Sequence, residues 1–338
     1  MVRSRTPTRK TVDRYKPLKP VEHARRDIRS SSLRSALCIA CAGLFFSSTF
    51  ESPPSTYDKI DYRSPDAPRR VAQSLRTLGF AIVKHHPINL DHIARAGAVW
   101  NSFFDGSSEE KYEYRFDPER HSGYVGMDQS ETAVGAREKD VKEFFHFHPT
   151  CRCPTDVKHE TERFFTESAS CARTILGWLQ DHLPDHTRAR MHGTLLQAVE
   201  DPQRDTMRAL RYPPAAIYGT HQAAEHTDVN LLTLLPAPSV AGLQMKLADG
   251  QWHNATTDPL ALIIGAGDML QELTNGYYMA GVHRVVPPEM RRAHPFPFSC
   301  MHTIAQSSPS GTRQRAFVTS VFVPSAWPKA LSGDVNKA

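Results

Sequence analysis

The chain has 338 residues, enough to bury a large core in one big domain or in two modest ones. Hydrophobic residues make up 40% and charged residues 23%, which is ordinary for a globular protein. The net charge of +5 comes from residues 1–35, which hold 11 Lys or Arg and 3 Asp or Glu, so the rest of the chain is net −3. This distribution argues against a nucleic-acid-binding body.

Residues 1–55 are predicted to be a basic, disordered extension. The apolar stretch Ala36–Phe46 inside it is too short to span a bilayer, so we expect no stable membrane insertion. The basic, Ser-rich composition leaves an organelle-targeting peptide or a short anchor within residues 1–50 as alternatives. The six cysteines are scattered, which is typical of free thiols in a reducing compartment, and the expected location is the cytoplasm.

The N-terminal half is predicted to be mainly helical. Residues 57–63 alternate apolar and polar side chains, as in a short strand. A helix is expected from Ser64-Pro65-Asp66 to Leu78, where Gly79 ends it. Phe80–Val83 follows as a buried strand and Leu90–Phe104 as a second helix. Residues 157–198 are predicted to be mostly helical.

After Arg204 the pattern changes to short apolar or alternating runs separated by Pro, Gly, Asn and Asp. Strands are expected at Met207–Tyr212, Leu231–Leu235, Gly242–Lys246, Ala261–Ile264 and Ala316–Val323. This spacing predicts a β barrel or sandwich in an α+β protein. The predicted regions are 56–204, mainly helical, and 205–328, the β core. One integrated unit and two separable domains both stay open.

The central motif is His226-Thr-Asp228. Side chains two residues apart on a strand point to the same face, so an imidazole and a carboxylate here can bind one metal ion. Two histidines and one carboxylate on a single face of the ion form the arrangement used by non-haem iron(II) oxygenases. A His-x-Asp tripeptide is expected about once by chance in a chain of this composition, so the neighbouring residues decide its meaning.

Those neighbours carry a family resemblance. They follow in the order Arg211-Tyr-Pro-Pro214, His226-Thr-Asp-Val-Asn-Leu-Leu-Thr-Leu-Leu235, Gly242-Leu-Gln244, Asp249-Gly-Gln-Trp252, Gly267-Asp-Met-Leu-Gln271, Thr274-Asn-Gly276 and His283-Arg-Val-Val286. This series resembles the isopenicillin N synthase-like branch of the 2-oxoglutarate/iron(II) dioxygenases. The resemblance extends more loosely over about 57–325 and does not include residues 1–50.

The resemblance implies a double-stranded β-helix, a jelly-roll core with flanking helices. It supplies His283 as the third iron ligand. It also implies a dioxygenase that uses 2-oxoglutarate, O2 and Fe(II), with ascorbate helping to keep the iron reduced. Such an enzyme oxidises a small organic substrate by hydroxylation, desaturation or ring closure and releases succinate and CO2. We expect a monomer, with no catalytic residue beyond the metal site.

Two further residues are assigned to the co-substrate by the resemblance. Arg315 is the candidate for binding the distal carboxylate of 2-oxoglutarate, although the family's Arg-x-Ser pattern has Phe317 in place of Ser. Arg292 is the alternative, but Pro295 close behind it is unfavourable in a central strand. Tyr212 occupies the position of the family's tyrosine near the co-substrate, and a structural core tyrosine is the alternative.

Three other functions remain open from the sequence. One is an iron oxidase that does not use 2-oxoglutarate, and another is an ethylene- and succinate-forming enzyme. The third is a catalytically inactive jelly-roll binding protein. The intact set of three ligand residues argues against this last alternative, because polar groups in a barrel mouth are costly to keep without a metal.

Overall fold

The computed structural model describes residues 58–130, 140, 142–212, 222–236, 242–256 and 258–286, with the backbone path of residues 298–305 and 320–323. The predicted extension 1–55 lies outside the described residues. Arg315 and its alternative Arg292 lie outside them too.

The first part of the described chain alternates short strands and helices, as predicted. Its elements are β1 (Lys59–Asp61), α1 (Ala67–Leu78), β2 (Phe80–Lys84), α2 (Leu90–Asp105), α3 (Ser108–Tyr112), β3 (Gly123–Val125) and β4 (Glu143–Phe147). Pro68 stands in the first turn of α1, where no helical hydrogen bond is lost, and Gly79 ends the helix with a φ of 71°. Ser107 and Glu110 form a capping box at the start of α3.

The long helix that follows ends earlier than the sequence indicated. It is α4 (Thr155–Asp181), and after it come only α5 (Asp185–Arg188) and short 3₁₀ turns. The prediction of mostly helix over 157–198 is confirmed for residues 157–181 and for α5, while the residues after Arg188 form turns. Pro184 interrupts the hydrogen-bond pattern, and Gly193 has a φ of 109°, outside the helical region.

The second part of the chain is mainly β, as predicted. Its elements are β5 (Thr206–Tyr212), β6 (Ala223–His226), β7 (Leu232–Pro236), β8 (Leu243–Lys246), β9 (Trp252–Asn254), β10 (Ala261–Ala266), α6 (Asp268–Leu273), β11 (His283–Val285), β12 (Phe298–Ala305) and β13 (Ser320–Val323). The sequence analysis predicted no strand at β12, which follows a proline-rich stretch and has no regular apolar alternation.

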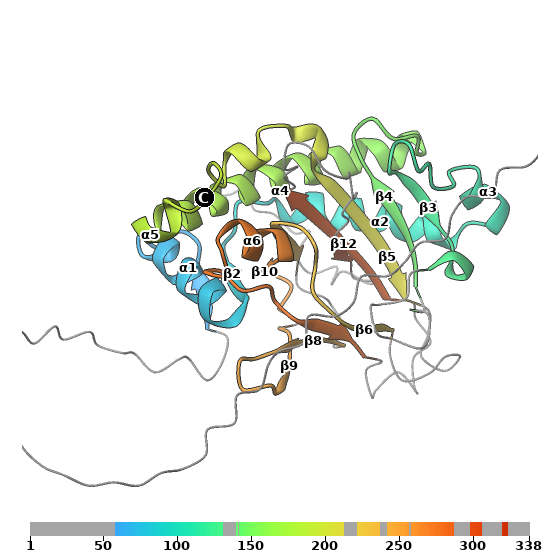
Figure 1. Cartoon of the computed structure of the whole chain (residues 1–338). Coiled ribbons are helices and arrows are strands. Elements are labelled where there is room, and N and C mark those ends of the chain that lie inside the picture. Colours follow the sequence, from blue (N-terminus) through green and yellow to red (C-terminus); the bar gives the residue numbers. More distant parts are fainter. Residues whose placement is uncertain are drawn as a thin grey trace, which may run out of the picture. The chain divides into compact units, whose positions relative to one another are not determined.

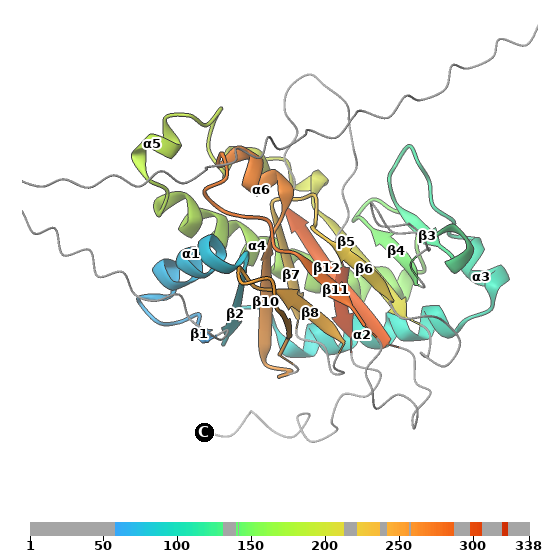
Figure 2. The same cartoon turned by 60° about the horizontal axis from the view of Figure 1, so that its bottom comes forward.

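The strands form two sheets. The larger has the order β1-β2-β10-β7-β12-β13-β5-β4-β3, and the smaller has the order β6-β11-β8-β9. Helices α2 and α4 pack against each other on one face of the larger sheet (Figures 1 and 2). Strands β6, β8 and β9 lie on its other side in Figure 1.

The apolar residues form two clusters, one on each face of the larger sheet. The first joins the helices to this sheet and includes Trp100, Phe145, Phe147, Phe164 and Leu176. The second, which we call the inner cluster, contains residues from both sheets. Its members are Phe80, Ile82, Val125, Phe144, Leu210, Tyr212, Ala223, Leu235, Leu243, Met245, Ala255, Ala261, Ile263 and Val285. Because successive strand residues face opposite sides, β4 places Phe144 in the inner cluster and Phe145 in the first.

Candidate metal centre

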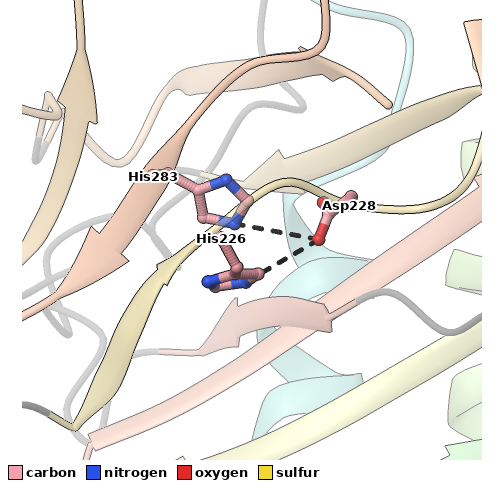
Figure 3. A group of neighbouring side chains, drawn as sticks. All are labelled: His226, Asp228 and His283. Carbon is pink, nitrogen blue, oxygen red and sulfur yellow. Dashed lines mark ion pairs between the residues drawn. The ribbon is translucent and has the colours of Figure 1, made fainter. Parts of the chain in front are cut away.

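The three predicted ligand residues lie together in the structure (Figure 3). His226 is the last residue of β6, Asp228 follows two residues later, and His283 begins β11. These strands pair antiparallel with His283 opposite His226, and the two ring centroids are 4.2 Å apart. Asp228 Oδ1 lies 3.9 Å from His226 Nε2 and 3.8 Å from His283 Nε2. One ligand atom from each residue lies within 4.8 Å of the other two.

Both imidazoles are oriented by backbone carbonyl groups. His226 Nδ1 lies 2.7 Å from the oxygen of Ala224, and His283 Nδ1 lies 3.2 Å from the oxygen of Gly281. A carbonyl can only accept, so each Nδ1 carries the proton and donates it. Each Nε2 then presents its lone pair toward Asp228, which is the tautomer that a metal ion requires.

Asp228 is held by groups that the sequence analysis did not identify. Thr233 Oγ1 donates a short hydrogen bond to Asp228 Oδ2, and Asn230 Nδ2 donates to Thr233 Oγ1 at 3.1 Å. The backbone amide of Asp268 donates to the carbonyl of Asp228 at 2.7 Å. Asp268 is the first residue of α6 and does not belong to the ligand group. The hydroxyl of Thr233 thus engages Oδ2 of Asp228, and Oδ1 faces the two imidazoles.

The electrostatics of the site keep the imidazole of His226 available for a metal. Burial, followed by the neighbouring His283, lowers the pKa of His226 to about 4, although Asp228 opposes this shift. His226 is therefore neutral at pH 7, as a metal ligand must be. Burial also raises the pKa of Asp268, assisted by the negative charge of Asp228.

The donor set fits a ferrous ion. Two imidazole nitrogens and one carboxylate oxygen can occupy one face of an octahedral ion and leave the other three positions open. Ligand atoms at right angles, each roughly 2.1 Å from a metal, are roughly 3 Å apart, so the two Nε2–Oδ1 separations each need to shrink by about 1 Å. No second group of three His, Cys, Asp or Glu side chains at ligand spacing occurs among the described residues.

Tyr212 and several other histidines of the described chain are not part of this group. Tyr212, at the end of β5, is 4% exposed and belongs to the inner cluster. His146 is buried on β4, where it contacts Arg208 rather than a carboxylate. Neither histidine of the pair His85-His86 belongs to the ligand group. Arg315 stays a prediction, because it lies outside the described residues.

Among the described residues, every helix is too short or too polar to cross a bilayer.

Two family models match the chain. The model described as non-haem dioxygenase in morphine synthesis N-terminal matches residues 57–167. The model of the 2OG-Fe(II) oxygenase superfamily matches residues 204–296, which include all three candidate ligands. Together they span the helical part and most of the β core.

Individual relatives agree with the family models. Gibberellin 2-beta-dioxygenase 4 from Arabidopsis thaliana is 26% identical over 64% of this chain and 70% of its own length. Flavanone 3-dioxygenase 2 from Oryza sativa subsp. japonica is 29% identical, over 67% and 68%. The crystal structure of a candidate oxygenase from Shewanella oneidensis is 32% identical with a TM-score of 0.67, and it covers 75% of this chain and 91% of that one.

The match in fold confirms the predicted jelly-roll core with flanking helices. Fe(II) and 2-oxoglutarate, predicted from the sequence resemblance, are the cofactor and co-substrate of the matched superfamily. The chain therefore belongs to the 2-oxoglutarate- and iron(II)-dependent oxygenase superfamily and is a dioxygenase of that family.

Proposed function

We propose that His226, Asp228 and His283 hold the ferrous ion of this dioxygenase and that the reaction takes place beside them. The observation that carries the proposal is the convergence of two imidazole Nε2 atoms on Asp228 Oδ1, at 3.9 and 3.8 Å. The two carbonyl groups that orient the rings and the hydroxyl of Thr233 support it, since such contacts preorganise a metal site.

When bound, the ferrous ion and 2-oxoglutarate together supply the activation of O2. The chain supplies a fixed face of three ligands, which leaves room for the co-substrate and O2 on the opposite face. For a hydroxylation, the substrate C–H bond becomes C–OH while 2-oxoglutarate and O2 become succinate and CO2. One oxygen atom enters the substrate and the other enters succinate.

The residues inside the jelly roll support a class of substrate, a small organic molecule with a hydrophobic body. The inner cluster is apolar and aromatic, which suits a small organic molecule with a hydrophobic body. Relatives named for gibberellin and for flavanone support this class. Nothing in the structure or among the relatives favours an oxidase without 2-oxoglutarate, an ethylene-forming enzyme or an inactive binding protein.

We also propose where and in which form the enzyme acts. Cys151, Cys153 and Cys171 are free thiols, which supports a reducing compartment, the cytoplasm. We further propose that the enzyme acts as a monomer.

The test of the metal ligands compares two aspartates that lie near each other. Asp228→Ala is expected to abolish Fe(II) binding and the charge-transfer absorption that 2-oxoglutarate produces with enzyme-bound Fe(II) under anaerobic conditions. Asp268→Asn keeps the backbone amide that contacts Asp228 and is expected to retain both. Stoichiometric iron binding by a folded Asp228→Ala variant would show that this carboxylate is not a ligand.

For the co-substrate we propose that Arg315 binds the distal carboxylate of 2-oxoglutarate and that Tyr212 lies beside it. A guanidinium fork suits bidentate binding of a carboxylate. Arg315→Ala is expected to keep iron and to raise the KM for 2-oxoglutarate by about tenfold or more, measured by succinate formation. If Arg315→Ala leaves this KM unchanged and Arg292→Ala raises it, the assignment moves to Arg292.

A further inference from the structure

Phe80, the first residue of β2, contacts a candidate iron ligand directly. It is buried and belongs to the inner cluster. Its ring meets the ring of His283 edge to face, with centroids 6.0 Å apart and an angle of 87° between the two planes. Edge-to-face contacts between rings are favourable and directional. A side chain from the N-terminal part of the chain therefore restricts the orientation of an imidazole on β11.

The Phe80 ring is held between two glycines. A Cβ atom added to Gly265 would lie 3.3 Å from Cε1 of Phe80, and one added to Gly281 would lie 2.5 Å from its Cζ. The ring thus lies against the backbone of β10 on one side and against the backbone just before β11 on the other. The carbonyl of Gly281 is the group that orients His283. Phe80 therefore packs on both the imidazole and the peptide group that orients it.

Phe80 is also part of a row of three residues across the larger sheet. Phe80 lies opposite Gly265 of β10, and Gly265 lies opposite Thr233 of β7. Residues directly opposite each other in antiparallel strands share one face of the sheet. We call Phe80, Gly265 and Thr233 the support row. A Cβ atom at Gly265 would lie 3.6 Å from the Cβ of Thr233, so the side chains on both sides of Gly265 border the space that its missing side chain leaves.

The support row contacts two of the three candidate ligands. Thr233 donates to Oδ2 of Asp228, and Phe80 packs on His283. His283 belongs to the smaller sheet, whereas the support row belongs to the larger one. The contacts of the row therefore bear on the position of Asp228 relative to His283, whose Oδ1 and Nε2 atoms are 3.8 Å apart (Figure 3).

We propose that Phe80 is a positioning residue for iron binding, whose ring fixes the plane of His283, and that Gly265 is needed because a side chain there would displace this ring. The inference rests on the dioxygenase function proposed above, because it concerns the same metal centre. Removal of a group that holds a metal ligand in place typically weakens metal binding by about 10- to 100-fold. Phe80 brings no charge and no hydrogen bond to His283, so its effect depends on the shape of its ring.

The first test removes the ring and keeps an apolar side chain. Phe80→Leu is expected to weaken Fe(II) binding about tenfold, measured by anaerobic titration of metal-free protein. When the variant is saturated with Co(II), whose visible absorption bands report the geometry of the ligands, these bands should differ from those of the wild type. An unchanged Fe(II) affinity together with unchanged Co(II) bands would contradict the positioning role.

Phe164→Leu is the matched control for this test. Phe164 is also a buried phenylalanine, but it lies on α4 and belongs to the first hydrophobic cluster. Its replacement should lower the stability of the fold, because it leaves a cavity in the core. It should keep the Fe(II) affinity and the Co(II) bands of the wild type.

The second test keeps the ring and displaces it. Gly265→Ala adds a methyl group 3.3 Å from Cε1 of Phe80, which is closer than an ordinary contact, so the ring has to shift against His283. We expect weaker Fe(II) binding and altered Co(II) bands. In a Phe80→Leu background the same change should have little further effect, because leucine has no atom at the Cε1 position. Additive effects of the two substitutions, or no effect of Gly265→Ala alone, would show that Gly265 does not act through Phe80.

The outcomes separate this inference from the proposed function. If the wild-type protein does not bind Fe(II), the metal centre and the proposed function are contradicted. If the wild type binds Fe(II) and Asp228→Ala does not, but Phe80→Leu binds as the wild type does, only the positioning role is contradicted. If Phe80→Leu and Phe164→Leu weaken binding equally and both keep the wild-type Co(II) bands, Phe80 acts through the stability of the fold, which also contradicts the positioning role.

Discussion

The orientation of Asp228 depends on one hydroxyl group. Thr233 Oγ1 donates to Asp228 Oδ2, and Asn230 Nδ2 donates in turn to that hydroxyl at 3.1 Å, which directs its proton toward the carboxylate. Thr233 is 6% exposed and Asn230 is fully buried, so water does not easily replace either contact. The remaining oxygen, Oδ1, faces the imidazoles because this pair holds the other one.

Replacement of Thr233 by Val keeps the shape of the side chain but removes the donor. We expect Thr233→Val to weaken Fe(II) binding by about 10- to 100-fold, the usual cost of losing a hydrogen bond to a metal ligand. Thr233→Ser, which keeps the hydroxyl, is the control and should bind iron within a few-fold of the wild type. The measurement is an anaerobic Fe(II) titration of metal-free protein. Equal affinity in the Val variant would mean that Asp228 is oriented by its backbone alone.

At the scale of elements, the end of α1 is packed against the segment that leads into β11. Gly79 has a φ of 71°, and a Cβ atom added there would lie 2.7 Å from Gly281 Cα and 3.0 Å from Gly281 N. The amide of Gly281 donates to the carbonyl of Ala266 at 2.9 Å, and the carbonyl of Gly281 orients His283. The two glycines therefore let the helix end approach the backbone that positions a candidate ligand.

Gly276 provides a control for this close contact. It has a φ of 80°, but a Cβ atom there would meet nothing within 4 Å. Gly276→Ala should cost about 1–2 kcal/mol of unfolding free energy, from the left-handed backbone alone. Gly79→Ala should cost about 1–3 kcal/mol more because it also collides with Gly281, and it should weaken Fe(II) binding as well. Denaturant unfolding and iron titration measure the two effects. Equal costs at both positions would contradict a role for the contact.

The elements show which parts of the structure the sequence could predict. Apolar runs and Gly79 predicted the strands and the end of α1, because these signals are local. Strand β12 was missed, since its pairing with β5 and β7 depends on partners about 65 to 100 residues earlier in the chain. The two-residue spacing of His226 and Asp228 indicated a candidate pair of ligands, but this spacing is expected about once by chance, and the neighbouring motifs were needed to interpret it. His283 required the family resemblance, and Thr233 could not be predicted because only the folded chain brings its hydroxyl to Asp228.

At the scale of the whole described chain, a buried ion pair joins α3 to β4, a strand of the larger sheet. Glu143 of β4 accepts hydrogen bonds from Lys111 Nζ at 2.8 Å and from the hydroxyl of Tyr124 at 2.5 Å. Burial, followed by the carboxylate of Glu143, raises the pKa of Tyr124, so that hydroxyl keeps its proton and donates. Lys111 also donates to the carbonyl of Phe104 at 3.2 Å, at the end of α2.

Because Lys111 belongs to α3 and Glu143 to β4, which pairs with β5 of the β core, their contact predicts cooperative unfolding. Glu143→Gln leaves the buried ammonium of Lys111 without its counter-charge and should cost about 3–5 kcal/mol. The first hydrophobic cluster also contains residues from both α2 and β10, so the loss of stability should appear equally in these two elements. Native-state hydrogen exchange of amides in α2 and in β10 measures the loss of stability in each element. As a control, the double variant Lys111→Met with Glu143→Leu should recover most of the stability, because it removes both buried charges. If Glu143→Gln accelerates exchange in α2 but not in β10, the helical region unfolds independently and is a separable domain.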